Sequence, residues 1–482
     1  MDWKEKLKQL GLGLGTSDTK PVSKVTPSPA VKRVYFCLGL DFGTSSTKAV
    51  IKMQTVDTAY AIPFFPGIAS ADLPYLAPTR LWVDEHEILG YQQTNSGGWI
   101  EDLKVRLMEK PWDSAPAWSG AMITATPAGL ATAYVALTIR EVMNWFNKQV
   151  KPTLGAVDIN WSFNLGIPAR DFDAKEIKDA FFSVACAGWN IAAEGNVISL
   201  NRAETAVEAA HLNSLSLIGI EKESVNVVPE VAAGVTSYVR SSQQRAGAHL
   251  FVDVGATTLD TSLFLLSEKG GEFQYTFLSA DVDSNLGALR LHKHRAKQLG
   301  ELALAKFAAS NPLQPIPQTA QDCVPNSTEL LQIDTDFTNL CLISIGSVIA
   351  RAKRKAPNDL SVHDNGTLQP KVYNESIRVL RSGGGMNLPL YSVAIDEVGI
   401  RVAPGGKLGL RVKPLETINL IMPDGLNAPG LDNINWSRMA IAYGLSFPFD
   451  DIGTFIPPSE VDEPDIPEKV DIQKNLITKD HM

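Results

Sequence analysis

The chain has 482 residues, of which 44% are hydrophobic and 20% charged, with a net charge of -9. This balance is typical of a globular protein with enough apolar material for more than one core. Because no excess of basic residues is available to neutralise phosphates, the composition argues against nucleic acid as a partner.

The cysteine and hydropathy patterns argue against several classes of protein. The four cysteines form no C-x-x-C pair, so neither a zinc site nor a redox site is indicated. The first fifteen residues lack the apolar stretch of a signal peptide. The longest mid-chain apolar run, Ala128 to Ile139, is about half of the ~20 residues that span a bilayer. We expect a cytoplasmic protein without a transmembrane segment.

Residues 1–33 are expected to lie outside the folded body. Residues 1–12 form an amphipathic pattern, with Trp3, Leu7 and Leu10 at helical spacing among lysines. A linker rich in Pro, Ser and Thr follows from Thr16 to Ala30. The segment is either a frayed terminus or a docking peptide for a protein partner, and peripheral contact with a membrane surface stays open.

The folded body mixes strands and helices, which predicts the α/β class. In chain order, we expect a hairpin over Val34–Met53, a helix from the Thr126 cap to about Lys148, a strand over Val157–Pro168, a helix over Ala174–Ala187 and a second hairpin over Leu250–Leu266.

Two segments have a composition that is unsuited to a hydrophobic core. Asn311 to Thr328 is rich in Pro, Gln, Asn, Ser and Thr, which predicts an exposed insertion. Residues 447–482 carry several prolines among scattered acids, which predicts a disordered acidic tail.

The first hairpin has the composition of a phosphate-binding turn. Asp41 follows an apolar run, and Gly43 would let the backbone approach an anion closely. Thr44, Ser45 and Ser46 offer backbone N–H and hydroxyl donors to phosphate oxygens. Asp41 would be repelled by phosphate, so it is expected to hold a hydrated Mg²⁺ instead. A plain hairpin turn is the alternative.

The second hairpin repeats this design. Asp253 again follows an apolar run, and Gly255, Ala256, Thr257 and Thr258 form the turn. Two such hairpins facing each other would clamp a triphosphate from both sides, with the two aspartates sharing the shell of one Mg²⁺.

From Val34 to Leu445 the chain resembles the ATPase domain of heat-shock-70 chaperones, within the actin-like ATPase superfamily. The resemblance rests on both hairpins and on short motifs between and after them, such as Gly166–Ala169 and Pro229–Ala233. It implies a two-lobed actin-like fold of duplicated ribonuclease H-like domains with a nucleotide cleft between them. Lobe I would span 34–246, with a small subdomain at about 61–124. Lobe II would span 247–446, with a small subdomain at about 288–373.

The resemblance also implies roles for individual residues. Glu230 would orient or partly deprotonate the attacking water, and Thr258 would face the γ-phosphate of ATP. Asp41 and Asp253 would bind Mg²⁺ through water. The residues implied to contact ATP or ADP are Gly43, Thr44, Ser45, Ser46, Gly255, Ala256, Thr257, Gly287, Lys353, Arg354, Gly383, Gly384, Gly385 and Asn387.

Some positions depart from the family pattern. Thr94 stands where the family carries a catalytic lysine, Asn387 where an arginine stacks on the base, and Arg438 where an acid precedes the closing segment. No peptide-binding domain follows residue 446 in this sequence, so the chaperone cycle on unfolded peptides is not implied. We expect a slow ATPase that acts as a conformational switch for a protein partner.

Three alternatives stay open. The first hairpin also resembles sugar-kinase loops. Such an enzyme needs a separate catalytic aspartate in the first lobe, for which the sequence offers no convincing candidate, with Asp171 and Asp173 left open. An actin-like filament-forming ATPase is the second alternative. The third is an ATP sensor with little hydrolysis, which Thr94 favours.

Overall fold

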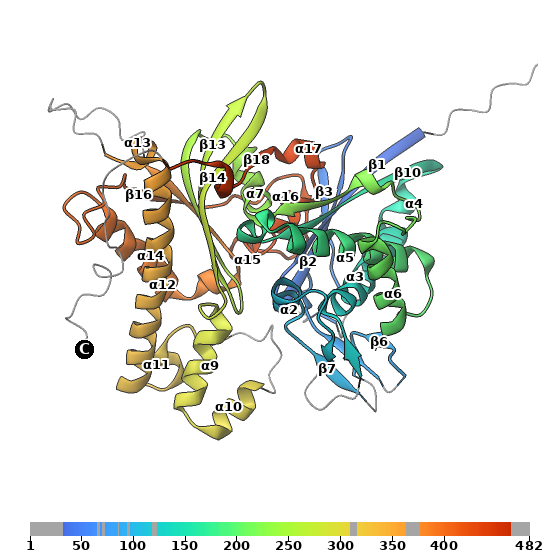
Figure 1. The fold of residues 1–482 in the computed structure, drawn as a ribbon, viewed down its shortest axis with the longest axis horizontal. Coiled ribbons are helices and arrows are strands. Elements are labelled where there is room, and N and C mark those ends of the chain that lie inside the picture. The colour runs from blue at the N-terminus through green and yellow to red at the C-terminus, as the bar shows by residue number, and fades with distance from the viewer. Residues whose placement is uncertain are drawn as a thin grey trace, which may run out of the picture.

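The computed structural model describes residues 32–463 except 65–67, 70–72, 85, 94–96, 118–122, 309–315 and 363–375. The expectations for residues 1–31, for Thr94 and for residues 464–482 therefore lie outside the described residues. The chain is a mixed α/β protein with two large sheets (Figure 1).

The first sheet is formed mainly by the N-terminal half of the chain. In spatial order its strands are β11 (Val225–Pro229), β10 (Val157–Ile167), β1 (Lys32–Phe42), β2 (Ser46–Met53), β3 (Thr58–Ala61) and β17 (Leu426–Asn427). The predicted hairpin is confirmed as the antiparallel pair β1–β2. Both β1–β10 and β10–β11 are parallel pairs.

The second sheet repeats this arrangement. Its strands are β16 (Leu415–Ile418), β15 (Ile377–Ser382), β12 (Gly247–Val254), β13 (Leu259–Lys269), β14 (Glu272–Asp283) and β18 (Thr454–Ile456). The second predicted hairpin is confirmed as the antiparallel pair β12–β13. Two parallel pairs, β12–β15 and β15–β16, follow on one side, and antiparallel β14 lies on the other. Each sheet therefore has an antiparallel hairpin flanked by parallel strands in the same order.

Two helices predicted from the sequence are present in the N-terminal half of the chain. The helix α3 (Pro127–Gln149) begins after Thr126, whose side-chain oxygen accepts a 2.9 Å hydrogen bond from the backbone N–H of Gly129. The helix α5 (Lys175–Glu194) runs seven residues beyond the predicted end at Ala187. It continues because Trp189 and Ile191 pack in the core, and it stops where Gly195 adopts the left-handed conformation.

The long helix α12 (Thr328–Lys355) belongs to the core around the second sheet. By length and composition it is the one helix among the described residues that could cross a membrane. Its Phe337, Ile345 and Val348 side chains are buried, and the helix packs against β13, β14 and α14 (Pro389–Val402). Core helices of globular domains pass the same test of length and hydropathy.

The predicted start of the disordered tail at residue 447 is wrong. Residues 447–463, here called the C-terminal segment, contain α17 (Phe449–Ile452), strand β18 and the short 3₁₀ helix η4 (Pro458–Glu460). Phe447 and Ile452 are buried, and β18 pairs in parallel with β14. The prolines suggested disorder, but the apolar residues between them bury enough surface to order the segment.

The described part of the predicted insertion, residues 316–328, is largely exposed, as its composition indicated, but two contacts anchor it to the core. Arg295, which is fully buried, forms a two-point ion pair with Asp334 and donates a 2.8 Å hydrogen bond to the carbonyl of Pro317. Ala320 is buried at the start of α11 (Ala320–Cys323). A buried arginine therefore anchors this largely exposed segment, a contact that its polar composition did not indicate.

Candidate functional site

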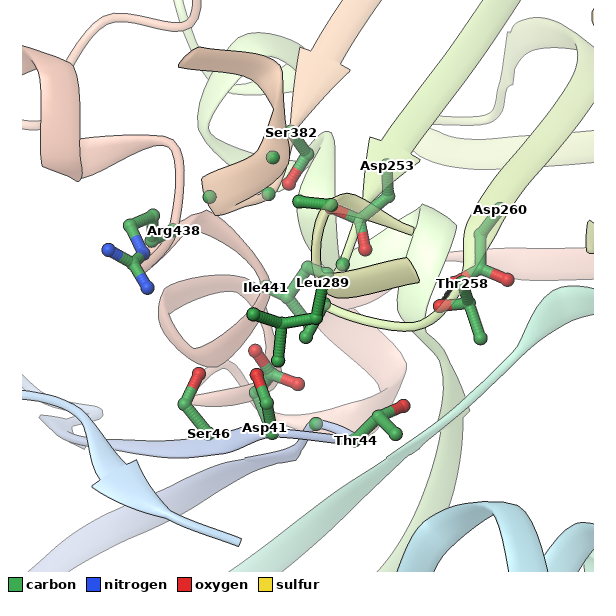
Figure 2. A pocket seen from close by; sticks show the side chains of 18 of the residues that line it. Asp41, Thr44, Ser46, Asp253, Thr258, Asp260, Leu289, Ser382, Arg438 and Ile441 are labelled. Atoms are coloured by element: carbon green, nitrogen blue, oxygen red, sulfur yellow. Dashed lines mark hydrogen bonds between the residues drawn. The ribbon is translucent and has the colours of Figure 1, made fainter. Parts of the chain in front are cut away.

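A cavity of about 660 Å³ lies where the turns of the two hairpins meet (Figure 2). Its volume falls within the range of roughly 300–1,000 Å³ that is typical of small-molecule sites. The sequence-predicted residues that line it are Asp41, Gly43, Thr44, Ser45, Ser46, Glu230, Asp253, Gly255, Ala256, Thr258, Gly383, Gly384, Gly385 and Asn387. Residues from both sheets thus contribute to one pocket.

The first hairpin presents a tight, charged turn to the cavity. The register of β1 and β2 places Asp41 opposite Lys48, and Lys48 Nζ lies 3.0 Å from Asp41 Oδ2. A Cβ atom at Gly43 would lie only 2.3 Å from the carbonyl oxygen of Ser46. Only glycine therefore allows this turn to close so tightly.

The second hairpin has the same register with a different partner. Asp253 on β12 lies opposite Asp260 on β13. The turn closes through a 2.9 Å hydrogen bond from the N–H of Gly255 to the carbonyl of Thr258, whose hydroxyl also donates to Asp260 Oδ2. The position of Lys48 in the first hairpin is therefore occupied by a carboxylate in the second.

Two predicted residues support this turn without lining the cavity. The N–H of Gly287 donates a 3.1 Å hydrogen bond to the carbonyl of Thr257, at the start of α9 (Ala288–Gln298). This contact packs the start of α9 against the second hairpin.

A buried ion pair lies on the wall that the first sheet provides. Glu230 is the first residue of α7 (Glu230–Gly234), directly after β11, and Lys104 comes from α2 (Leu103–Glu109). Lys104 Nζ lies 2.6 Å from Glu230 Oε1, and both side chains are less than 10% exposed, at 6% and 8%. Burial alone would lower the pKa of Lys104, but the carboxylates of Glu230, Asp41 and Asp260 raise it above its ordinary value.

Burial and crowding raise the pKa values of the acids. Burial raises the pKa of Glu230 to about 7, with Asp41 adding to the effect and Lys104 opposing it. Burial and then Asp253 raise the pKa of Asp260 to about 8. The pKa of Asp253 is also raised, by burial and by Asp41. Among the described residues, Lys48 and Lys104 are the cations that lie beside these acids of the pocket.

The donor set fits a hydrated divalent cation. Asp253 Oδ1 and Asp260 Oδ1 are buried and have no hydrogen-bond partner, as expected of carboxylates whose partner is a bound ion or its water. Within the described part of the chain, no three His, Cys, Asp or Glu side chains converge closely enough to ligate a metal directly. Asp253 and Asp260 therefore fit a divalent cation that keeps its water, whereas Asp41 is paired with Lys48. Binding of Mg²⁺ by Asp41 and Asp253 stays a prediction.

We expect Asp260→Asn to stabilise the nucleotide-free protein by on the order of 3 kcal/mol at pH 8. The folded protein holds a proton on Asp260 up to about pH 8, whereas the unfolded chain releases it near pH 3.9. The free energy of unfolding of the unsubstituted protein therefore falls as pH rises between these values, and asparagine does not titrate. Denaturant unfolding at pH 5 and pH 8 measures the effect. A stability difference that does not grow with pH would contradict it.

The glycine turn after β15 forms another wall of the cavity. Gly383 adopts a φ of 84°, and a Cβ atom there would lie 2.5 Å from Asp253 Oδ1. A side chain at this position would therefore strain the backbone and displace the Asp253 carboxylate.

The described lining of the cavity does not include Lys353 and Arg354, for which the resemblance implied contacts with the nucleotide. Both lie in the last turn of α12, and neither is among the residues that line the cavity. Arg354 Nε lies 3.5 Å from Glu463 of the C-terminal segment, and the neighbouring Arg351 pairs with Asp281 of β14. The end of α12 thus faces the sheet and the C-terminal segment, which the sequence pattern did not indicate.

Other residues in the pocket were missed or given no role. Lys48 and Asp260 each follow the aspartate of their hairpin by seven positions, a repeated offset that could have indicated them. No local signal in the sequence marks Lys104 as a pocket residue. Ser382 and Arg438 also line the cavity.

The two acids considered for a sugar-kinase mechanism lie outside this pocket. Asp171 contacts the neighbouring Arg170, and Asp173 accepts a hydrogen bond from Ser459 of the C-terminal segment. Neither is among the residues that line the cavity.

No protein-family model matches the chain, and no curated protein is significantly similar to it.

Proposed function

We propose that the protein binds Mg²⁺-ATP in this pocket and hydrolyses it slowly, as a heat-shock-70-like member of the actin-like ATPase superfamily. The observation that carries the proposal is that Asp41 and Asp253, at equivalent places in two hairpins of two similarly ordered sheets, line one cavity. Such a duplication is what a two-lobed actin-like fold with a nucleotide between its lobes requires.

Each wall offers groups suited to one part of the nucleotide. The turns at 43–46 and 255–258 offer backbone N–H groups and hydroxyls to the phosphates, and Thr258 would face the γ-phosphate. The glycine turn at 383–385 lets the nucleoside lie against the backbone. When bound, Mg²⁺ would neutralise the charge that builds on the phosphates.

Glu230 is the group that orients the attacking water and accepts a proton from it. Its pKa of about 7 places it where a carboxylate can act as a base at neutral pH. Its side chain is fixed by the 2.6 Å contact with Lys104. Hydrolysis would then drive a conformational change that alters the binding of a cytoplasmic protein partner.

Lys104 can supply the positive charge of the catalytic lysine that the resembled family carries at the position of Thr94. Its ammonium group enters the cavity from the first sheet's side and is surrounded by the acids of the pocket. A cation at this place can stabilise negative charge on the transferred phosphoryl group, which favours hydrolysis over a purely sensing role.

The test is phosphate release from Mg²⁺-ATP by the purified chain, with no acceptor added. We expect a slow release that stops when EDTA removes the metal and returns when Mg²⁺ is restored, since the carboxylates alone repel the nucleotide. Release that needs an added small-molecule acceptor would indicate a kinase instead, and absence of any release would contradict the ATPase assignment.

A further inference from the structure

Arg438 lies at the end of the pocket away from the second phosphate turn. It comes between α15 (Asn433–Trp436) and α16 (Ala440–Leu445). Figure 2 shows it at the left of the cavity, while Thr258 and Asp260 lie at the right. The lysines that can offset phosphate charge, Lys48 and Lys104, come from the first sheet's side of the cavity.

Burial of its neighbours fixes the position of Arg438. Trp436 and Met439 are almost completely buried, at 1% and 0% exposure. The hydroxyl of Ser382, directly before the glycine turn, donates a 3.2 Å hydrogen bond to the carbonyl of Ser437. Buried residues therefore hold the chain on both sides of Arg438, and one hydrogen bond joins it to the end of β15.

The guanidinium group lies directly over the glycine turn. A Cβ atom at Gly384 would lie 2.8 Å from Arg438 Nε and 2.9 Å from its Cζ. The absence of a side chain at Gly384 thus leaves the space that the guanidinium plane uses.

No acid balances this charge. Burial lowers the pKa of Arg438, and no carboxylate of the described residues offsets the effect. Over the same residues, no ion pair or hydrogen bond of its side chain is found. A partly buried guanidinium without an anion is stabilised by a flat, electron-rich ring, because it is weakly hydrated and stacks on aromatic faces.

We propose that Arg438 stacks on the nucleobase of the bound nucleotide. The inference rests on the proposed ATP site and adds to it the residue that holds the base. Asn387, at the position where the resembled family carries its stacking arginine, has no positive charge and so cannot make a cation–π contact. The chain supplies the planar cation from a different segment, directly before α16.

The test is calorimetric titration of the full chain with Mg²⁺-ATP and, separately, with Mg²⁺-tripolyphosphate. We expect Arg438→Ala and Arg438→Lys each to weaken ATP binding by about 5- to 30-fold, since lysine keeps the charge but loses the plane. Tripolyphosphate affinity should stay within about twofold, because the phosphate turns are untouched. Arg381→Lys, on β15 and bonded to Ser392, is the control and should leave both affinities unchanged.

A second substitution approaches the same contact from the other side. Gly384→Ala should displace the guanidinium, since a new methyl group would meet it at 2.8 Å. Gly384→Ala alone should weaken ATP binding. Combined with Arg438→Ala it should cause no further loss of ATP affinity, because the two changes remove the same contact.

Three results would overturn the inference. The first is an Arg438→Lys variant that binds ATP as tightly as the unsubstituted protein. The second is a variant of Arg438 that loses affinity for tripolyphosphate as much as for ATP. Either result would indicate that Arg438 contacts phosphate rather than the base. The third, no binding of Mg²⁺-ATP by the unsubstituted protein, would overturn the ATP site together with the role of Arg438.

Discussion

Asp253→Asn is expected to lower the turnover of Mg²⁺-ATP by about 10²- to 10³-fold while the protein stays folded. Asp253 lines the cavity, with a buried Oδ1 that has no hydrogen-bond partner. Asparagine keeps the shape of the side chain but loses the charge that a hydrated Mg²⁺ needs. Turnover is measured by phosphate release in single-turnover and steady-state assays.

The same substitution should stabilise the protein in the absence of nucleotide. Burial and Asp41 raise the pKa of Asp253, so its ionised form is unfavourable in the folded chain at neutral pH. Asp158→Asn is the control, because Asp158 lies in β10 with a side chain 54% exposed. If Asp253→Asn kept normal turnover and normal dependence on Mg²⁺, the role of Asp253 would be contradicted.

Lys104→Met is expected to lower turnover by a similar factor, about 10²- to 10³-fold. The substitution removes the one ammonium group that contacts Glu230, at 2.6 Å, while a side chain of similar length still fills the space. The matched control is Lys110→Met, since Lys110 is the C-cap residue of the same helix, α2, and its side chain is 74% exposed. Lys110→Met should turn over ATP normally.

The pH dependence separates this role of Lys104 from a merely structural one. Glu230 must be ionised to accept a proton, and its pKa is about 7, so kcat/KM should rise with pH up to about 7 and then level off. Lys104 lowers that pKa, so Lys104→Met should move the rising limb to higher pH. An unshifted limb in Lys104→Met, or full activity in Glu230→Gln, would contradict the assignment.

The sequence predicted the parts of the fold that local pattern determines. The β1–β2 and β12–β13 hairpins follow from apolar runs that end in an aspartate and a glycine turn, and the Thr126 cap marked the start of α3. These features depend on neighbours in the chain. Most of the predicted pocket residues lie in these turns, which explains why the structure brings them to one cavity.

The errors concern contacts between distant segments. Lys353 and Arg354 look like a basic helix face, but the packing of α12 on β14 turns its end toward the C-terminal segment. Lys104 reaches Glu230 across 126 positions of the chain. The order of residues 447–463 depends on burial against elements far earlier in the sequence, such as Asn164, which donates to the carbonyl of Phe447. No local pattern carries such information.

The central claim is that both hairpins hold one Mg²⁺-bound triphosphate. The most direct measurement is an experimental structure of the full chain with Mg²⁺ and a non-hydrolysable ATP analogue. We predict that the β- and γ-phosphates lie between residues 43–46 and 255–258, with Asp41 and Asp253 facing the metal and its water. An analogue bound elsewhere, or bound by only one of the two turns, would contradict the account.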